Sequence, residues 1–152
     1  VGGPHDAGVA WDSDDVAGDV QRFLAERLFA AEMAGIARNR LVVDPGYGFN
    51  KDTAQNFALL AAQEKLLALG VPLLAGLSRK RCIGEVTGRT VAAERVAGSV
   101  AAHLLAVQRG AGIVRVHDVA ATVDALKVLA ALDAVPAPRA DRVAPPRWPD
   151  ED

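Results

Sequence analysis

VPLLAGLSRK, the stretch from Val71 to Lys80, decides the fold. Its apolar and small residues lead to Gly76, after which the polar cluster Ser78-Arg79-Lys80 begins abruptly. A short apolar run bounded by turn residues is typical of a strand buried on both faces, as in parallel sheets. Open α/β sheets and (β/α) barrels bind their ligands at the carboxyl ends of such strands. We therefore interpret the cationic end of this stretch as part of a ligand site.

The same design, an apolar run that ends in polar residues, occurs once before this stretch and once after it. The two segments are LVVDPGYGFNK, residues 41–51, and GIVRVHDV, residues 112–119. Alternating helices and strands indicate parallel strands joined by right-handed crossovers. Apolar residues at helical spacing predict four main helices and one short helix. The predicted main helices are 16–34, 53–69, 91–109 and 119–132, and the short helix is 81–86.

The spacing of the helix ends favours a barrel. Gly35, Gly70 and Gly110 each follow a predicted helix, where a glycine commonly ends the last turn. Their separation of about 35 to 40 residues is that of a βα unit. A parallel sheet of only three hydrophobic strands would leave two open edges. The predicted fold class is therefore α/β, a (β/α)8 TIM barrel of which three parallel strands and four main helices form about the second half.

Composition limits the classes of partner. The 152 residues are 51% hydrophobic but only 5% aromatic, and the net charge of −2 gives no bulk field for nucleic acid or anionic membranes. The single cysteine excludes an internal disulfide and favours a reducing, cytoplasmic location. No 18-residue apolar run and no charged, apolar leader occur, so we expect neither a membrane span nor a signal peptide. Small molecules are the expected ligands.

Three segments are predicted as separate units. Residues 1–15 are a Gly- and Asp-rich loop, residues 16–133 form the partial barrel, and residues 134–152 hold five of the eight prolines and are expected to be disordered. Capping signals are Asp52 with Gln55, at the start of helix 53–69, and Asp118, before the last helix. His5 and Trp11 are interpreted as surface-loop residues, and Cys82 and His103 as packing residues.

Polar groups follow all three strands. A barrel closes its strand ends around one mouth, so these groups are expected to converge on one ligand. Asp44 can accept hydrogen bonds from a flat heterocycle, and Lys80 can donate to a ring carbonyl or nitrogen. Arg115 and His117 alternate with valines, point the same way, and form a phosphate clamp. Taken singly, an ordinary Asp-Pro-Gly turn and a salt-bridged rim explain these residues without a ligand.

Three motifs in this order and spacing carry a family resemblance: DPGYGFNK (44–51), GLSRKRCIGEVTGR (76–89) and GIVRVHDV (112–119). From about Asp15 to Leu132 the chain resembles the second half of dihydropteroate synthase, the folate-pathway enzyme and sulfonamide target. The resemblance implies a TIM barrel that condenses 6-hydroxymethyl-7,8-dihydropterin pyrophosphate with p-aminobenzoate. The products would be 7,8-dihydropteroate and pyrophosphate, and the implied cofactor is Mg²⁺.

The resemblance also implies roles for single residues. Asp44, Lys80 and Arg115 would be catalytic, and with Gly76 they would bind the pterin; Arg115 and His117 would bind pyrophosphate. The implied p-aminobenzoate pocket comprises Phe49, Ser78, Arg79 and Arg81, the last of which stands where many relatives have serine. No metal ligand is expected in this sequence, because the family's metal-binding asparagine belongs to the first half of the barrel. We accordingly expect the chain alone to be an inefficient synthase, and a homodimer is the expected assembly.

Two other functions stay open from the sequence. The first is a non-catalytic pterin- or phosphate-binding remnant that associates with itself through open sheet edges. The second is the pterin-dependent methyltransferase barrel, which shares the pterin-binding mode but not the combination of SRK and RVHD. Arg81 and Arg89 could equally be solvated surface charges.

Overall fold

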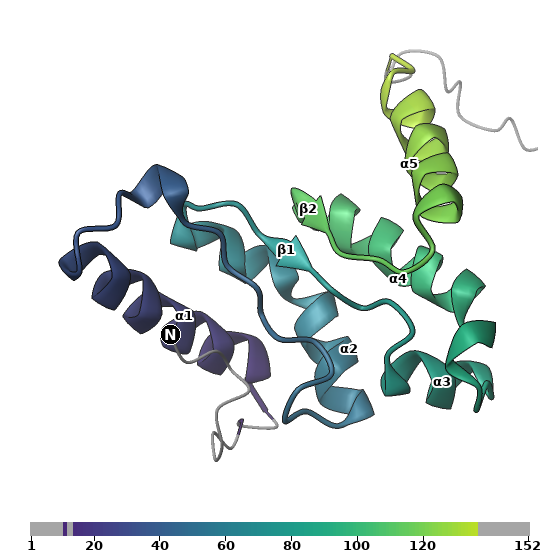
Figure 1. Cartoon of the computed structure of the whole chain (residues 1–152), viewed down its shortest axis with the longest axis horizontal. Helices are drawn as coiled ribbons and strands as arrows, with labels where there is room; N and C mark the ends of the chain where they lie inside the picture. The colour runs from purple at the N-terminus through teal and green to yellow at the C-terminus, as the bar shows by residue number, and fades with distance from the viewer. Residues whose placement is uncertain (1–10, 12–13, 137–152) are drawn as a thin grey trace, which may run out of the picture.

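A computed structural model describes residue 11 and residues 14–136 (Figure 1). His5 and the predicted disordered segment beyond Pro136 lie outside the described residues, and the predicted domain boundaries stay predictions. Trp11, interpreted as a surface-loop residue, is instead buried in the core, at 8% exposure. The elements, in chain order, are α1 (Val16–Met33), η1 (Arg38–Arg40), α2 (Thr53–Ala61), η2 (Gln63–Leu69), β1 (Leu74–Ala75), α3 (Arg81–Thr87), η3 (Ala92–Glu94), α4 (Val96–Gln108), β2 (Ile113–Val114) and α5 (Val119–Asp133).

Three extended segments run parallel, as predicted. Leu74 and Ala75 of β1 pair with Ile113 and Val114 of β2, and Val43 makes a single parallel bridge to Leu73 on the other side of β1. The spatial order therefore follows the chain order. The predicted first strand contributes only one bridge, and both strands have two residues. One reason for the short pairing is that the residue before Leu73 is proline, which has no N–H to donate.

The central stretch is buried on one face rather than both, so this part of the prediction is wrong. Leu73, Ala75 and Leu77 alternate along the strand and are almost inaccessible, with exposed fractions of 2%, 0% and 1%. Pro72 is exposed and Leu74 is half-buried on the opposite face. Leu73, Ala75 and Leu77 therefore face the interior, whereas the opposite face of the strand is only partly covered.

Most helix boundaries agree with the local signals. The capping box is present, because the Gln55 N–H donates to Asp52 Oδ1 (2.7 Å) and the Asp52 N–H donates to Gln55 Oε1 (3.0 Å). Gly35, Gly70 and Gly110 have φ values of +87°, +67° and +88°, the left-handed conformation that ends a helix at low cost.

Two predicted helices are broken. The one expected over 53–69 changes into the 3₁₀ helix η2 at Gln63. The buried Gln63 side chain donates to the carbonyls of Ala106 (2.8 Å) and Arg109 (3.0 Å), which ties this point of the chain to the end of α4. The helix expected over 91–109 divides into η3 and α4. Tertiary contacts, which periodicity does not encode, set these breaks.

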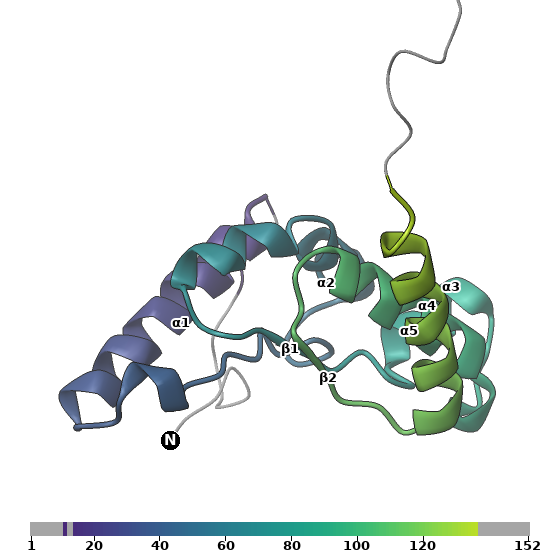
Figure 2. The ribbon, with the colours of Figure 1, turned by 90° about the horizontal axis from the view of Figure 1, so that it is seen from above.

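Helices that are close in the chain pack on one another. α1 packs on α2 and η2, and α4 packs on α3, β2 and α5. Figure 2 shows β1 and β2 in the middle of the molecule, with α1 towards one end and α5 towards the other. Within the described part of the chain, no helix combines the length and apolar character needed to cross a membrane.

Candidate functional site

A cavity of about 510 Å³ lies at the carboxyl ends of β1 and β2, where the sequence predicts a ligand site. Six of the residues predicted to bind a ligand are part of its wall. The lining residues are Gly76, Ser78, Arg79, Lys80, Ala92, Arg115, Val116 and His117. The structure therefore brings the polar ends of the second and third parallel segments to one place.

Asp44 joins this cluster from the first parallel segment. Its Oδ2 lies 3.5 Å from Nη2 of Arg115, and its Oδ1 accepts a hydrogen bond from the N–H of Gly46 (2.8 Å). The Arg115 side chain is 59% exposed and that of Asp44 is 34% exposed. Exposed ion pairs are typically worth about 1 kcal/mol or less, so a ligand can separate this pair at small cost.

Lys80 completes the group of three predicted catalytic residues. Its Nζ lies 3.9 Å from the centroid of the Phe49 ring, a cation–π contact between two candidate binding residues. Burial lowers the pKa of Lys80, the Arg115 charge lowers it further, and the Asp44 carboxylate opposes both effects. Phe49 therefore lies beside the cavity, in contact with one of its lining residues.

Two glycines make room for these cations. A Cβ on Gly48, which has φ of +78°, would lie 2.7 Å from Cδ of Lys80. A Cβ on Gly76 would lie 2.7 Å from Nη2 of Arg115. In the structure, both glycines let the binding side chains lie flat against the backbone.

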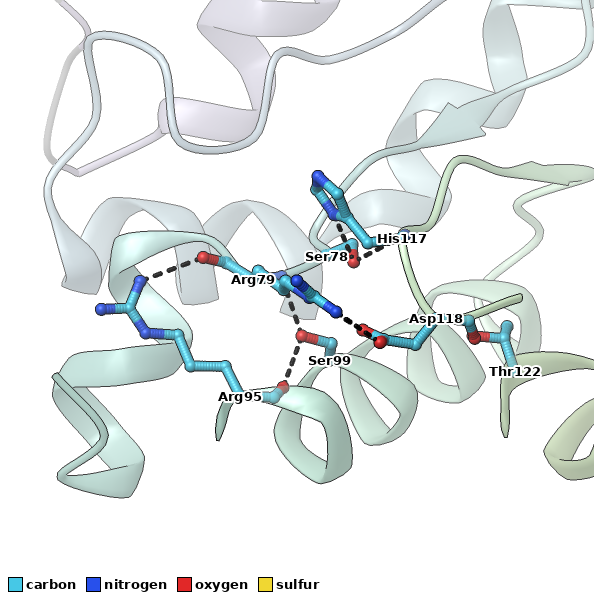
Figure 3. Close-up of polar contacts among 7 residues, drawn as sticks. All are labelled: Ser78, Arg79, Arg95, Ser99, His117, Asp118 and Thr122. Carbon is cyan, nitrogen blue, oxygen red and sulfur yellow. Dashed lines mark hydrogen bonds and ion pairs between the residues drawn. The ribbon is translucent and has the colours of Figure 1, made fainter. Parts of the chain in front are cut away.

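Ser78 holds His117. The buried Ser78 Oγ accepts a hydrogen bond from the His117 N–H (3.1 Å) and lies 2.9 Å from His117 Nδ1 (Figure 3). In the neutral tautomer that carries its proton on Nε2, Nδ1 accepts a hydrogen bond from the serine hydroxyl. His117 then presents an N–H donor, which suits an anionic ligand. This geometry gives Ser78 an orienting role that the sequence does not reveal.

Arg79 is held by Asp118. Its Nε and Nη2 donate to the two carboxylate oxygens of Asp118 at 3.1 and 2.6 Å (Figure 3). The hydrogen bonds from Arg79 lower the pKa of Asp118. Asp118 occupies the N-cap position of α5, as predicted, but its side chain makes no capping hydrogen bond to the helix. The carboxylate has a stronger, bidentate partner.

The turn at Arg79 is strained. It is held by two residues of α4 and by Arg95, which directly precedes that helix. Arg79 has φ of +56°, a left-handed value that costs free energy in a residue other than glycine. Its N–H donates to Ser99 Oγ (2.8 Å), and its carbonyl accepts from Arg95 Nη1 (3.0 Å). The Leu77 N–H donates to Nε2 of His103 (3.1 Å). Side chains at one helical face thus fix the backbone of the cavity wall.

Three residues support this turn: Arg95, Ser99 and His103. The sequence analysis singled out only His103, and only as a packing residue. His103 is buried, at 1% exposure, as expected of a packing residue, but it also hydrogen-bonds the turn. Arg95, Ser99 and His103 are spaced by four residues, so they share one face of the helix. Polar residues at this spacing in an otherwise apolar helix are the signal that could have found them.

Replacing Ser99 by alanine should loosen the turn. The Arg79 N–H would lose its acceptor, and we expect the free energy of unfolding to fall by about 1 to 2 kcal/mol. Urea denaturation measures this change. Thr90→Ala, at an exposed position, is the matched control and should change stability by less than about 0.5 kcal/mol. Equal effects of the two substitutions would contradict the role of Ser99.

His103 should make stability depend on pH. Burial lowers its pKa, and protonation would place a proton on Nε2, against the Leu77 N–H. The unfolded chain then binds more protons than the folded one below a pH of about 6.5, so stability is lost as the pH falls through that value. We expect the urea midpoint to drop between pH 7.5 and 5.5 by less in His103→Gln than in the parent. Equal drops would contradict this assignment.

Arg81 is placed away from the cavity. It lies on a second concavity, beside Gly84, Glu85, Gly88, Arg89, Thr90 and Arg95. Its side chain is 73% exposed, and its Nε lies 3.5 Å from Glu85. The structure therefore does not bring Arg81 to the other predicted p-aminobenzoate residues, and a solvated surface charge describes it better.

The residues around the cavity do not fit a metal ion. In residues 11 and 14–136, no group of three or more histidine, cysteine or acidic side chains could hold one. Lys80 and Arg115 place positive charge at the cavity, and Asp44 is already bonded to Arg115 and Gly46. No Mg²⁺ step is therefore assigned to these residues.

Parallel βα units whose polar groups meet at the carboxyl ends of the strands define this protein as part of an α/β barrel with a small-molecule site. Comparison with known proteins gives the family: residues 4–117 match the model for pterin binding enzymes. The chain belongs to the pterin binding enzyme family.

Its relatives are dihydropteroate synthases. The enzyme of Neisseria meningitidis serogroup B is 55% identical over 121 residues, which cover 78% of this chain and 42% of that protein. The structure of the Xanthomonas albilineans enzyme with 7,8-dihydropteroate has a TM-score of 0.80 at 64% identity and covers 83% of this chain and 49% of that chain. The structure of the Stenotrophomonas maltophilia enzyme has a TM-score of 0.82 at 62% identity and covers 90% of this chain and 51% of that chain.

The comparisons confirm the predicted fold. The chain spans about half the length of these relatives, and its parallel βα units correspond to about half of a TIM barrel. The resemblance inferred from the three motifs is confirmed as well. The roles inferred for single residues stay predictions.

Proposed function

We propose that this chain carries part of the active site of a dihydropteroate synthase. The reaction joins 6-hydroxymethyl-7,8-dihydropterin pyrophosphate to p-aminobenzoate and releases pyrophosphate. The observation that carries the proposal is the meeting of Asp44, Lys80 and Arg115 from three successive strand ends. Similar structures support it: a Xanthomonas albilineans synthase, 65% identical, was solved with 4-aminobenzoic acid, and a Thermus thermophilus synthase, 49% identical, with 6HMPPP.

The residues suit the charge that the reaction develops. Departure of pyrophosphate leaves positive charge on the pterin methylene carbon and negative charge on the leaving group. The Arg115 guanidinium and the Nε2–H of His117 would stabilise the leaving group, and Ser78 keeps that imidazole in the required orientation. Asp44 would accept N–H groups of the pterin and stabilise its electron-poor ring. Binding would therefore replace the Asp44–Arg115 ion pair by one ligand contact for each partner.

Positioning would supply much of the remaining rate. The amine of p-aminobenzoate is neutral at pH 7 and attacks without a strong base, so the site has to align it with the methylene carbon. Lys80 would donate to the pterin ring, and Phe49 would contact the p-aminobenzoate ring beside it. Their contact at 3.9 Å supports an arrangement in which the pterin and p-aminobenzoate sites adjoin.

Several broader features are part of the same proposal. The reaction is expected to use Mg²⁺, a cytoplasmic location is expected, and sulfonamides are expected to compete with p-aminobenzoate. A homodimer is also proposed, because α5 exposes large apolar side chains such as Val128 (72%) and Leu132 (65%).

A chimera provides the test. The amino-terminal portion of the Xanthomonas albilineans enzyme is joined ahead of this chain, and incorporation of radiolabelled p-aminobenzoate is measured with the intact relative as the positive control. We expect dihydropteroate to form. A folded chimera that binds dihydropterin pyrophosphate but forms no product would favour the non-catalytic pterin-binding alternative. Neither binding nor product would contradict the proposal altogether.

A further inference from the structure

A buried lysine closes the loop that carries two of the candidate binding residues. Lys51 is only 6% exposed. Its Nζ donates to three backbone carbonyls, those of Pro45 (3.1 Å), Gly46 (3.0 Å) and Phe49 (3.2 Å). The loop from 45 to 49 therefore folds around the ammonium group of Lys51, two residues further along the chain.

The chemistry of the group matches this enclosure. An ammonium has three donors and no acceptor, and here three carbonyl oxygens receive them. The face of the Trp11 ring lies 4.6 Å from Nζ and adds a cation–π contact. Burial lowers the pKa of Lys51 to about 8, while Asp44 opposes the shift, so the ammonium predominates at pH 7. A buried charge without these partners would be costly.

The loop needs such support because its backbone is unusual. Gly46, Gly48 and Asn50 all have positive φ, at 71°, 78° and 49°. Asn56 provides a second clamp, since its Oδ1 accepts from the Gly48 N–H (2.7 Å) and its Nδ2 donates to the Lys51 carbonyl (3.2 Å). The lysine side chain binds the loop from within, and Asn56 binds it from α2.

The loop determines where two candidate binding groups lie. Asp44 directly precedes the first carbonyl that Lys51 binds, and its carboxylate reaches Arg115 at 3.5 Å. Phe49 supplies the third carbonyl, and its ring lies 3.9 Å from Nζ of Lys80. One ammonium therefore fixes both ends of the segment that faces the cavity cations.

We propose that Lys51 is a positioning residue for the synthase reaction. Its ammonium holds Asp44 close to Arg115 and Phe49 close to Lys80. This inference rests on the proposed function. Lys51 does not touch the substrates; it acts through the backbone of the loop. A loop displaced by about 1 Å can cost on the order of 100-fold in rate, so the effect of losing the ammonium is measurable.

The test compares three variants of the chimera described above. Lys51→Met keeps the length of the side chain and removes the charge, and Lys51→Arg keeps the charge but replaces three divergent donors by a planar fork. Lys127→Met is the matched control, because that lysine is 74% exposed on α5. We expect kcat/KM to fall at least about tenfold in Lys51→Met and by an intermediate factor in Lys51→Arg. The control should stay within about twofold of the parent.

A double-mutant cycle separates positioning from general stability. If Lys51 acts through Asp44, then Asp44→Asn costs less activity in the Lys51→Met background than in the parent. The parent, the two single variants and the double variant are assayed at a temperature where denaturation curves show each of them to be folded. Full activity of Lys51→Met, or losses that simply add, would overturn the proposal.

A spectroscopic measurement keeps this inference distinct from the proposed function. A lysine-selective ¹H–¹⁵N spectrum should contain one slowly exchanging ammonium resonance that disappears in Lys51→Met and persists in Lys127→Met. Its absence from the parent would overturn the enclosed geometry whatever the activity. A parent chimera with this resonance but without synthase activity would refute the proposed function, and the catalytic part of this inference with it, but not the loop closure.

Discussion

Arg115→Ala should lower kcat/KM of the chimera by about 100- to 1000-fold, the range found when a single group that stabilises developing negative charge is removed. Arg115 lines the cavity, lies against Gly76, and has only Asp44 as an ion-pair partner within the described residues, at 3.5 Å. In the proposed reaction it would receive the leaving pyrophosphate. Steady-state rates with both substrates varied measure the loss.

Two companion variants define what the loss means. Arg115→Lys keeps the charge but removes the bidentate fork, so an intermediate loss is expected. Arg109→Ala changes a half-buried arginine at the end of α4, and should have little effect because, within the described residues, its side chain hydrogen-bonds only to the Leu105 carbonyl. If Arg115→Ala and Arg109→Ala behave alike, the assignment of Arg115 to the leaving group is wrong.

Lys80→Ala should lower kcat/KM by about 10- to 100-fold, because a hydrogen bond from a charged group is worth about 1.5 to 3 kcal/mol. Lys80 lies at the meeting point of three features: the cavity wall, the Phe49 ring and the backbone at Gly48. Its pKa is lowered by burial and by Arg115, so a ligand acceptor would relieve an unfavourable environment. The loss should appear mainly in the KM for dihydropterin pyrophosphate.

Lys80→Met tests whether the ammonium or the aliphatic stem is responsible. The stem packs close to Gly48, and methionine preserves much of that contact. We expect Lys80→Met to lose nearly as much as Lys80→Ala. Parental kinetics in Lys80→Met would instead show that the side chain serves only to pack the loop, and the proposed pterin contact would have to be abandoned.

The features predicted correctly from sequence depend on neighbours along the chain. The Asp52–Gln55 capping box and the helix-ending glycines follow from residues within one turn of each other, and the structure contains them. The parallel order of the strands follows from alternation alone. The meeting of Asp44 and Arg115 was also predictable, because parallel strands place their carboxyl ends at one edge.

The features that sequence reasoning missed depend on distant partners. Asp118 is the N-cap residue of α5, but its carboxylate binds a guanidinium 39 residues earlier in the chain rather than the helix. Gln63 breaks a helix because its side chain reaches α4, 43 residues later. Lys51 reads as one more charge in a polar loop until the structure shows it buried against three carbonyls. No local pattern distinguishes these residues from solvated ones.

A crystal structure of the chimera with dihydropterin pyrophosphate tests the central claim most directly. The account predicts one ligand that contacts the Asp44 carboxylate and the Lys80 ammonium through its pterin ring and the Arg115 guanidinium through its diphosphate. The 3.5 Å ion pair between Asp44 and Arg115 should be replaced by these contacts. A ligand bound elsewhere, or one that leaves any of the three side chains without a contact, would contradict it.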